Sequence, residues 1–147
     1  MEDSEFEWLI QNRLVPGQSE AQTSRVWIMI LTDIFKRADG YSTGAEMTFG
    51  GGRADLFTAQ VVAKTRHEEM KFLVVECKPP NQERRGKVWK EAAEQLEGYL
   101  TAITSRNRKF GAISVGKYVR FYELVKTEGK QYLTDFNGDR SVYRLDR

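Results

Sequence analysis

The sequence predicts an α/β fold, a sandwich around a central mixed sheet with helices on its faces. The main observation is the order of apolar patterns along the chain: helix, strand, strand, strand, helix, strand, strand. The second is length, because 147 residues fit one domain with a proper core. The third is composition, with 40% hydrophobic and 30% charged residues, as in ordinary soluble globular proteins. We expect a helical extension at 1–18, a core at 19–125 and short strands at 126–147.

Two helices are expected before the first strand. Ser4 and Glu7 have the spacing of a capping box, which opens a short helix through Leu14. Ser19 is predicted to cap a longer helix, with Gln22 at the reciprocal position. The residues expected on the core-facing stripe of this helix are Trp27, Ile30, Leu31, Ile34 and Phe35.

Three strands are predicted next, at 45–49, at 53–63 and, after a polar bend at 64–71, a third that ends at Lys78. Side chains alternate along a strand, so one face of the third strand should carry Phe72, Val74, Glu76 and Lys78. The opposite face should carry Leu73, Val75 and Cys77.

A helix at 87–105 and two strands at 110–115 and 118–125 complete the predicted core. The small residues Ala92, Ala93 and Gly98 are expected to let this helix approach the sheet closely. Turn signals at 128–130 and 137–138 divide the tail into two further short strands. The residues at helical spacing that should face the sheet are Val88, Ala92, Leu96, Tyr99, Leu100 and Ile103.

Three charged residues of the second and third strands point to a chemical site. Asp55 should lie beside Glu76 and Lys78, and burying such charges is costly unless they are paired or bind a metal. Two carboxylates are hard oxygen ligands that suit Mg²⁺. Lys78 would then orient or deprotonate a water that attacks phosphorus. The pattern therefore predicts phosphodiester hydrolysis. The alternatives are a turn-capping role for Asp55, a salt bridge from Glu76 to Lys78 or Arg53, and an exposed strand-end position for Lys78.

The order Asp55, twenty intervening residues, Glu76-x-Lys78 and then Gln95-x-x-x-Tyr99 resembles the PD-(D/E)XK nuclease superfamily, which has the restriction-endonuclease-like fold. The pair Gln95 and Tyr99 is similar to branches such as the nuclease domains of type I restriction motor subunits. The resemblance covers roughly Glu20 to Val125. It departs at Ala54, where the family often has a proline.

The resemblance implies a nuclease that uses Mg²⁺ or Mn²⁺, with DNA as the expected substrate and RNA as the alternative. Small nucleases of this fold often work as homodimers. Asp55, Glu76 and the carbonyl of Cys77 would hold the metal, and Lys78 would serve the attacking water. Gln95 would bond to Lys78 or to a water, and Tyr99 to a phosphate or to the carboxylates. Glu20 is a candidate third acidic group, with Glu7 as a weaker rival; the alternative for Glu20 is a carboxylate that stabilises the helix dipole.

Charge distribution supplies the candidate nucleic-acid contacts, because a net charge of +2 is too weak to indicate such a partner. One basic cluster follows the third strand, and Arg53 lies beside Asp55. A second cluster comprises Arg106, Arg108 and Lys109, and for both clusters a solvated surface is the alternative. The first cluster comprises Arg84, Arg85, Lys87 and Lys90.

Composition disfavours several other classes of protein. The single cysteine, Cys77, permits no internal disulfide and should pack in the core, while the single histidine, His67, makes zinc and serine-triad sites poorly supported. The acidic start and the lack of a long apolar run favour an intracellular protein without a membrane partner. Two alternatives stay open: a nucleic-acid-binding module without activity, and a protein-interaction domain.

Overall fold

The computed structural model describes residues 4–49, 52–62, 68–103 and 108–146, and between 45 and 71 it describes the backbone alone. Two helices, α1 (Ser4–Arg13) and α2 (Glu20–Ile34), precede the sheet, and α3 (Gly86–Ala102) lies between its third and fourth strands. Short 3₁₀ turns occupy Arg37–Asp39, Pro80–Gln82 and Phe136–Gly138.

The described residues form a seven-stranded mixed sheet in the order β1-β2-β3-β4-β5-β6, with β7 also paired to β5. Only β3 and β4 are parallel, and α3 makes the crossover between them, as parallel neighbours require. The strands are β1 (Tyr41–Phe49), β2 (Gly52–Val62), β3 (Glu68–Lys78), β4 (Lys109–Val115), β5 (Tyr118–Thr127), β6 (Lys130–Asp135) and β7 (Tyr143–Arg144).

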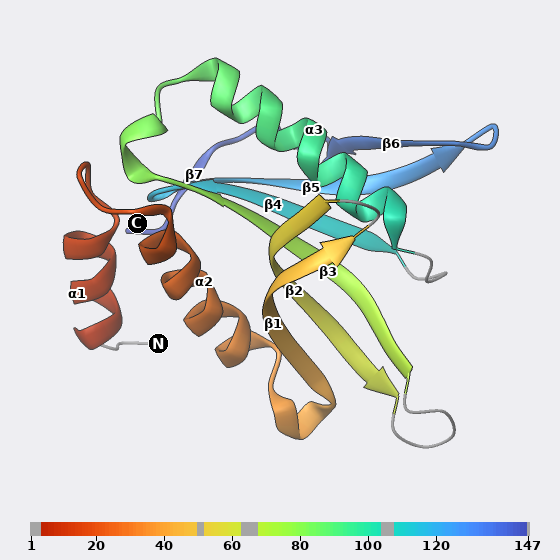
Figure 1. The fold of residues 1–147 in the computed structure, drawn as a ribbon, viewed down its shortest axis with the longest axis horizontal. Helices are drawn as coiled ribbons and strands as arrows, with labels where there is room; N and C mark the ends of the chain where they lie inside the picture. Colours follow the sequence, from red (N-terminus) through yellow and green to blue (C-terminus); the bar gives the residue numbers. More distant parts are fainter. Residues whose placement is uncertain (1–3, 50–51, 63–67, 104–107, 147) are drawn as a thin grey trace.

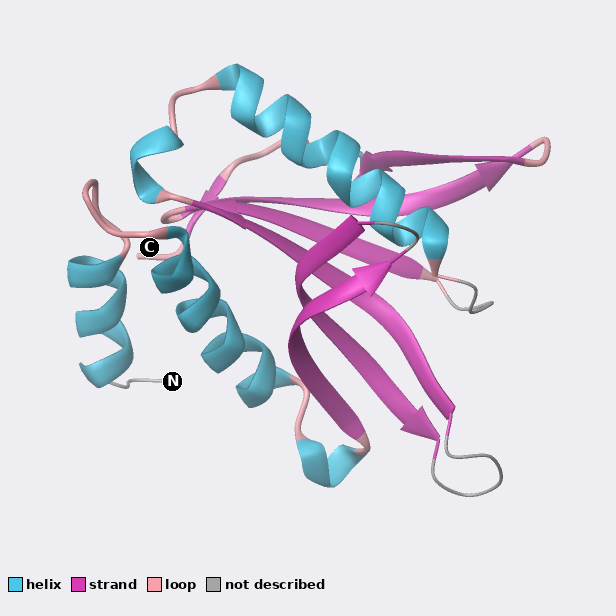
Figure 2. Ribbon diagram, viewed as in Figure 1, coloured by secondary structure: helices cyan, strands magenta, loops and turns pink. Residues whose placement is uncertain are grey.

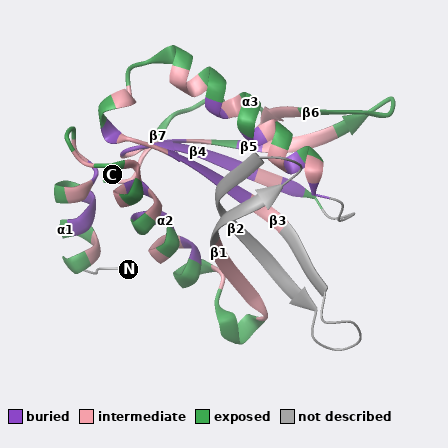
Figure 3. Cartoon of the chain, in the orientation of Figure 1, coloured by how far each residue is buried: buried purple, intermediate pink, exposed green. Residues whose placement is uncertain are grey.

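Helices cover both faces of the sheet (Figures 1 and 2). On one face, Leu96 and Leu100 of α3 pack with Val74. On the other, Trp27 and Leu31 of α2 pack with Val75 and Cys77, and α1 packs against the outer side of α2. Buried residues gather in β3 and β4, the middle of the sandwich (Figure 3). The expected α/β class with a mixed sheet and helices on both faces is confirmed.

Two strands begin well before their predicted starts. β1 starts at Tyr41, and β3 starts at Glu68, inside the stretch predicted as a polar bend. Backbone pairing in the antiparallel β1-β2-β3 ladder therefore outweighs the polar composition of 68–71. The loop between β5 and β6 is the predicted tight turn, with positive φ at Glu128 (52°) and Gly129 (80°).

The predicted alternation along β3 holds from Leu73 to Lys78 but is wrong at Phe72. Pairing with β2 jumps from Thr58–Leu73 to Ala59–Lys71, so Phe72 is an extra residue in a β-bulge. Its ring packs edge-on against Phe35 at 5.3 Å between centroids, on the α2 face with Leu73. The bulge reverses the direction in which Phe72 points.

Two expectations for α2 are also wrong. Ser19 stands at the N-cap position with extended backbone, but its side chain makes no capping hydrogen bond. Ile34 is 64% exposed, whereas Val26, absent from the predicted stripe, is fully buried against α1. Ile34 is exposed because the helix ends there. The ring of the next residue, Phe35, packs inward beside Tyr41 and Phe72.

The stripe predicted for α3 is buried at Ala92, Leu96, Leu100 and Ile103, but Gly98 does not provide the close approach. A methyl group at Gly98 would meet no atom within 4 Å. The close approach is at Gly111 of β4, where a Cβ would lie 2.6 Å from a methyl carbon of Leu96. The sheet, not the helix, carries the glycine that lets the two elements meet.

Gly98→Ala is expected to stabilise the protein by about 0.5–1 kcal/mol, because alanine loses less backbone entropy in a helix and the site has open space. Urea unfolding followed by circular dichroism measures the difference. A fall in the free energy of unfolding would contradict the open surroundings of Gly98.

None of the helices in the described ranges is long and apolar enough to cross a lipid bilayer.

Candidate functional site

Lys78, the last residue of β3, connects two side chains from different elements. Its Nζ lies 3.2 Å from Oε1 of Glu76, two residues earlier on the same face of the strand. The same Nζ donates a hydrogen bond of 3.1 Å to Oε1 of Gln95 on α3. The expected bond between Gln95 and Lys78 is thus present, and it ties the helix to the end of the strand.

The Glu76 carboxylate is held in a largely dry position. Its side chain is 4% exposed and that of Lys78 is 19% exposed, so both charges have lost most of their water. Glu76 lies between Val74 and Lys78 on the face that α3 covers, and Cys77 points to the opposite face among α2 residues, as predicted. A carboxylate so placed keeps its charge only with cationic partners close by.

The backbone carbonyl of Lys78 accepts hydrogen bonds from two further parts of the fold. The hydroxyl of Thr23 in α2 donates to the Lys78 carbonyl at 3.1 Å, and the backbone N–H of Gly116 approaches the same oxygen at 3.3 Å. Thr23 is fully buried. The helix on one face and the β4–β5 turn therefore fix the position from which the Lys78 side chain extends. In the sequence, the only sign of this role for Thr23 is a hydroxyl inside an otherwise apolar stripe.

Asp55 belongs to β2, but its side chain lies outside the described residues. The backbone register places its neighbour Leu56 opposite Val75, the residue before Glu76. In an antiparallel pair, the next positions along the two strands are Asp55 and Glu76. Asp55 and Glu76 thus each lie one residue beyond the last pair of this ladder, and the convergence of their carboxylates stays a prediction. The side chain of Arg53, also in β2, lies outside the described residues.

Three other predicted residues have defined places. Glu20 opens α2 one turn before Thr23 and is partly buried, which puts it at the helix end nearest the tip of β3. Tyr99 is partly buried and packs at the edge of the α3 cluster, one turn from Gln95. Glu7, the rival of Glu20, is exposed on α1.

The first basic cluster is exposed but does not form one patch. Lys87 pairs with Glu91 at 3.7 Å, and Lys87, Glu91 and Gln95 recur every four residues along one flank of α3. Lys90 lies on the other flank, beside Glu94 and Asp135. Arg84 and Arg85 precede the helix and are exposed. Only part of the cluster therefore flanks the side of α3 that carries Gln95.

The second basic cluster is not the predicted surface cluster. Lys109 is buried, and its ammonium donates to the carbonyl of Ile103, the residue that ends α3. Burial lowers the pKa of Lys109, and the charge of Lys126 lowers it further. Arg108 is exposed but pairs with Glu123 at 2.7 Å, and Arg106 lies outside the described residues. A helix C-terminus leaves carbonyls without partners, and Lys109 satisfies one of them.

The described side chains include no group of three or more histidine, cysteine or acidic residues that could hold a metal ion. Asp55 falls outside that set. The donor chemistry nevertheless suits a hard divalent cation, because Glu76 presents a dehydrated carboxylate next to the strand position of Asp55. The backbone carbonyl of Cys77 lies between Glu76 and Lys78, and the Cys77 side chain points away.

A hollow of about 790 Å³ lies on the α2 face of the sheet, opposite to the face that carries Glu76 and Lys78. Its lining is almost wholly apolar and includes Trp27, Phe35 and Phe121, with Asp139 as the one charged residue. Neither Glu76 nor Lys78 lines it. Hydrolysis requires groups that move protons or stabilise charge, so the Glu76–Lys78–Gln95 site is the better candidate for chemistry.

Comparison of the chain with protein-family models, with curated proteins and with solved structures found no match.

Proposed function

We propose that this protein is a divalent-metal-dependent nuclease that hydrolyses phosphodiester bonds, with DNA as the expected substrate and RNA as the alternative. The observation that carries the proposal is the Lys78 ammonium, held between the buried carboxylate of Glu76 and the amide oxygen of Gln95. These are three of the five residues of the motif that suggested nuclease chemistry, and they converge from a strand and a helix.

The order of elements supports the same conclusion. A helix, three antiparallel strands, a crossover helix and a strand parallel to the third form the core. This order is similar to the restriction-endonuclease-like fold, and we assign the chain to that fold as part of the proposal. Glu76 and Lys78 end the third strand, where that fold carries its catalytic residues.

Each residue has a distinct part in the proposed reaction. Lys78 orients the attacking water and offsets the negative charge that develops on the phosphate oxygens. Gln95 and the backbone contacts from Thr23 and Gly116 hold the lysine in place, which reduces the reorganisation needed during the reaction. Glu76 pairs with the ammonium and, with Asp55, would provide carboxylate oxygens for the metal.

Asp55 and Glu76, with the Cys77 carbonyl, would hold Mg²⁺ or Mn²⁺. Such an ion supplies charge neutralisation at the phosphate and activation of water. A site with two carboxylates and one lysine gives a net negative charge that attracts a divalent cation.

Cleavage assays with duplex DNA, single-stranded DNA and RNA, in Mg²⁺, in Mn²⁺ and in EDTA, test the proposal. We expect cleavage with either metal and none in EDTA. Glu76→Gln removes one carboxylate at nearly constant volume and should abolish cleavage, whereas Glu91→Gln, one turn from Gln95 but exposed, should leave it unchanged. Absence of cleavage by the wild-type protein under all these conditions would contradict the proposal, and binding without cleavage would identify a binding module.

A further inference from the structure

A second site lies on the same face of the sheet as Lys78. It is a hollow of about 250 Å³ lined by Glu83, Arg84, Trp89, Tyr118 and Val142. Its walls thus hold two aromatic rings and an exposed arginine. The volume falls below the roughly 300–1,000 Å³ of sites for drug-sized ligands, and it suits a single planar ring system.

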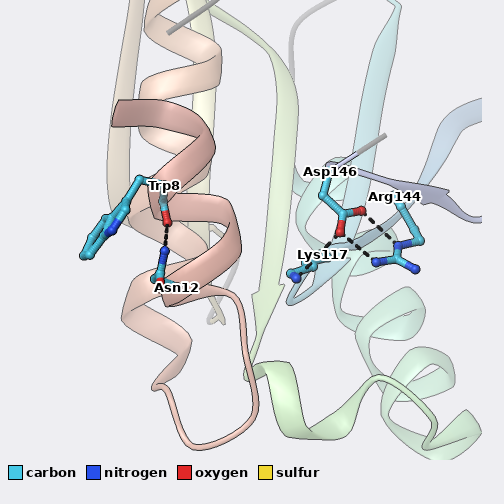
Figure 4. A network of polar contacts seen from close by, with 5 residues as sticks. All are labelled: Trp8, Asn12, Lys117, Arg144 and Asp146. Carbon is cyan, nitrogen blue, oxygen red and sulfur yellow. Dashed lines mark hydrogen bonds and ion pairs between the residues drawn. The ribbon is translucent and has the colours of Figure 1, made fainter. Parts of the chain in front are cut away.

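Both aromatic rings are held in place. The Trp89 indole N–H donates to the carbonyl of Glu83 at 2.9 Å, which fixes the ring against the turn before α3. The guanidinium of Arg144 lies over the Tyr118 ring at 5.4 Å from its centroid. Asp146 holds that guanidinium with contacts of 2.9 and 2.7 Å and also lies 3.6 Å from Lys117 (Figure 4). A ring fixed in this way loses little entropy when a ligand stacks on it.

Strand register connects this hollow with Lys78. Lys78 pairs with Val115 across β3 and β4, and Val115 pairs with Tyr118 across β4 and β5. Two strand spacings separate the Cα atoms of Lys78 and Tyr118, about 10 Å. Val119 packs in the cluster on the α2 face, so Tyr118 points to the α3 face, the face of Lys78. A short stretch of nucleic acid can span this distance.

The charges of the hollow favour a nucleotide over a cationic ligand. Arg84 is exposed at the rim, and Arg85 and Lys87 follow it in the chain. Glu83 is the one acidic wall residue; burial raises its pKa, and a backbone hydrogen bond and the charge of Lys117 lower it in part. The carboxylate is thus engaged with Lys117, and the rim presents positive charge to a phosphate backbone.

We propose that this hollow, which we call the aromatic pocket, binds an unpaired nucleobase stacked on Tyr118 or Trp89, and that it places the adjoining strand at Lys78. Aromatic side chains beside basic residues are the usual platform for single-stranded nucleic acid. The inference rests on the proposed function for the identity of the ligand, and it adds that the substrate has single-stranded nucleotides next to the bond that is cut.

The test measures binding in EDTA, so that it is independent of cleavage. The probe is a labelled oligothymidylate of about ten nucleotides, with a blunt duplex of equal length for comparison, and the readout is fluorescence anisotropy. Tyr118→Ala should weaken single-strand binding about 5- to 150-fold, and Tyr118→Phe, which keeps the ring, should restore it. Tyr132→Ala, which removes a 45% exposed aromatic ring on β6, is the matched control and should have no effect.

Trp89→Leu provides a second variant if Tyr118→Ala fails to fold, and it should weaken the same probe. Wild-type affinity for the single strand in both ring-deleted variants would contradict the proposed base-binding pocket. An equal loss of affinity for the duplex would contradict it too. The two proposals fail separately. Metal-dependent cleavage by the wild-type protein, with normal single-strand binding by both Tyr118→Ala and Trp89→Leu, would support the nuclease and contradict the pocket. Ring-dependent binding without any cleavage would support the pocket and contradict the nuclease.

Discussion

Replacing Lys78 with methionine is expected to slow phosphodiester cleavage by about 10²- to 10⁴-fold, the usual contribution of a positioned acid–base group. Methionine keeps the length and apolar stem of lysine but removes the ammonium that contacts Glu76 and Gln95. Binding of nucleic acid should change far less, because the ammonium is held by Glu76 and Gln95 and the Lys78 side chain is only 19% exposed. Single-turnover cleavage with saturating protein separates the two effects.

Lys87→Met is the matched control for that experiment. Lys87 lies on the same flank of α3 as Gln95, but its side chain is 85% exposed. We expect it to raise the apparent Kd modestly and to reduce the salt dependence of binding, with the cleavage rate at saturation unchanged. A Lys78→Met protein that is folded and cuts at the wild-type rate would show that the chemistry has been assigned to the wrong residue.

Leu96→Ala is expected to destabilise the protein by about 2–5 kcal/mol, the usual range for deleting a buried leucine side chain. Leu96 is fully buried between α3 and the sheet and reaches Gly111 on β4. Ile34→Ala should change stability by less than about 0.5 kcal/mol, because Ile34 is mostly exposed despite its equal hydrophobicity. Urea unfolding of both variants gives the comparison.

A double-mutant cycle isolates the contact between Leu96 and Gly111. Gly111→Ala alone should cost about 1–3 kcal/mol, since its Cβ would lie within 3 Å of three Leu96 side-chain atoms. In the Leu96→Ala background those atoms are gone, and the same substitution should be nearly neutral. Equal costs in the two backgrounds would show that the helix and the strand are not in contact at this point.

The candidate site was largely predictable because its residues depend on short-range periodicity. Glu76 and Lys78 share a face since they are two residues apart on a strand, and Cys77 points the other way for the same reason. The position of Gln95 could not be predicted from periodicity alone. Periodicity places Gln95 on a flank of α3, and only the motif suggested that this flank meets Lys78. The pairing of β2 with β3 up to Leu56, the neighbour of Asp55, was predictable because the two strands follow each other in the chain.

Other features depended on pairings that no local pattern contains. The bulge at Phe72 is one extra residue relative to β2, and a strand's own alternation carries no sign of it. Thr23 meets the Lys78 carbonyl across 55 residues of chain. Lys109 belongs to a basic run in the sequence, yet its ammonium donates a hydrogen bond to the carbonyl of Ile103 at the end of α3.

The sequence by itself determined the class of fold, the succession of helices and strands, and the face on which Glu76 and Lys78 lie, because these follow from backbone periodicity and from the cost of burying charge. Only the tertiary structure decided which distant groups hold Lys78, where Phe72 and Ile34 point, and that Tyr118 lies two strands from the lysine on the same face. The reason is that such contacts arise from the register between strands and from the packing of helices on the sheet, and both are properties of the assembled chain.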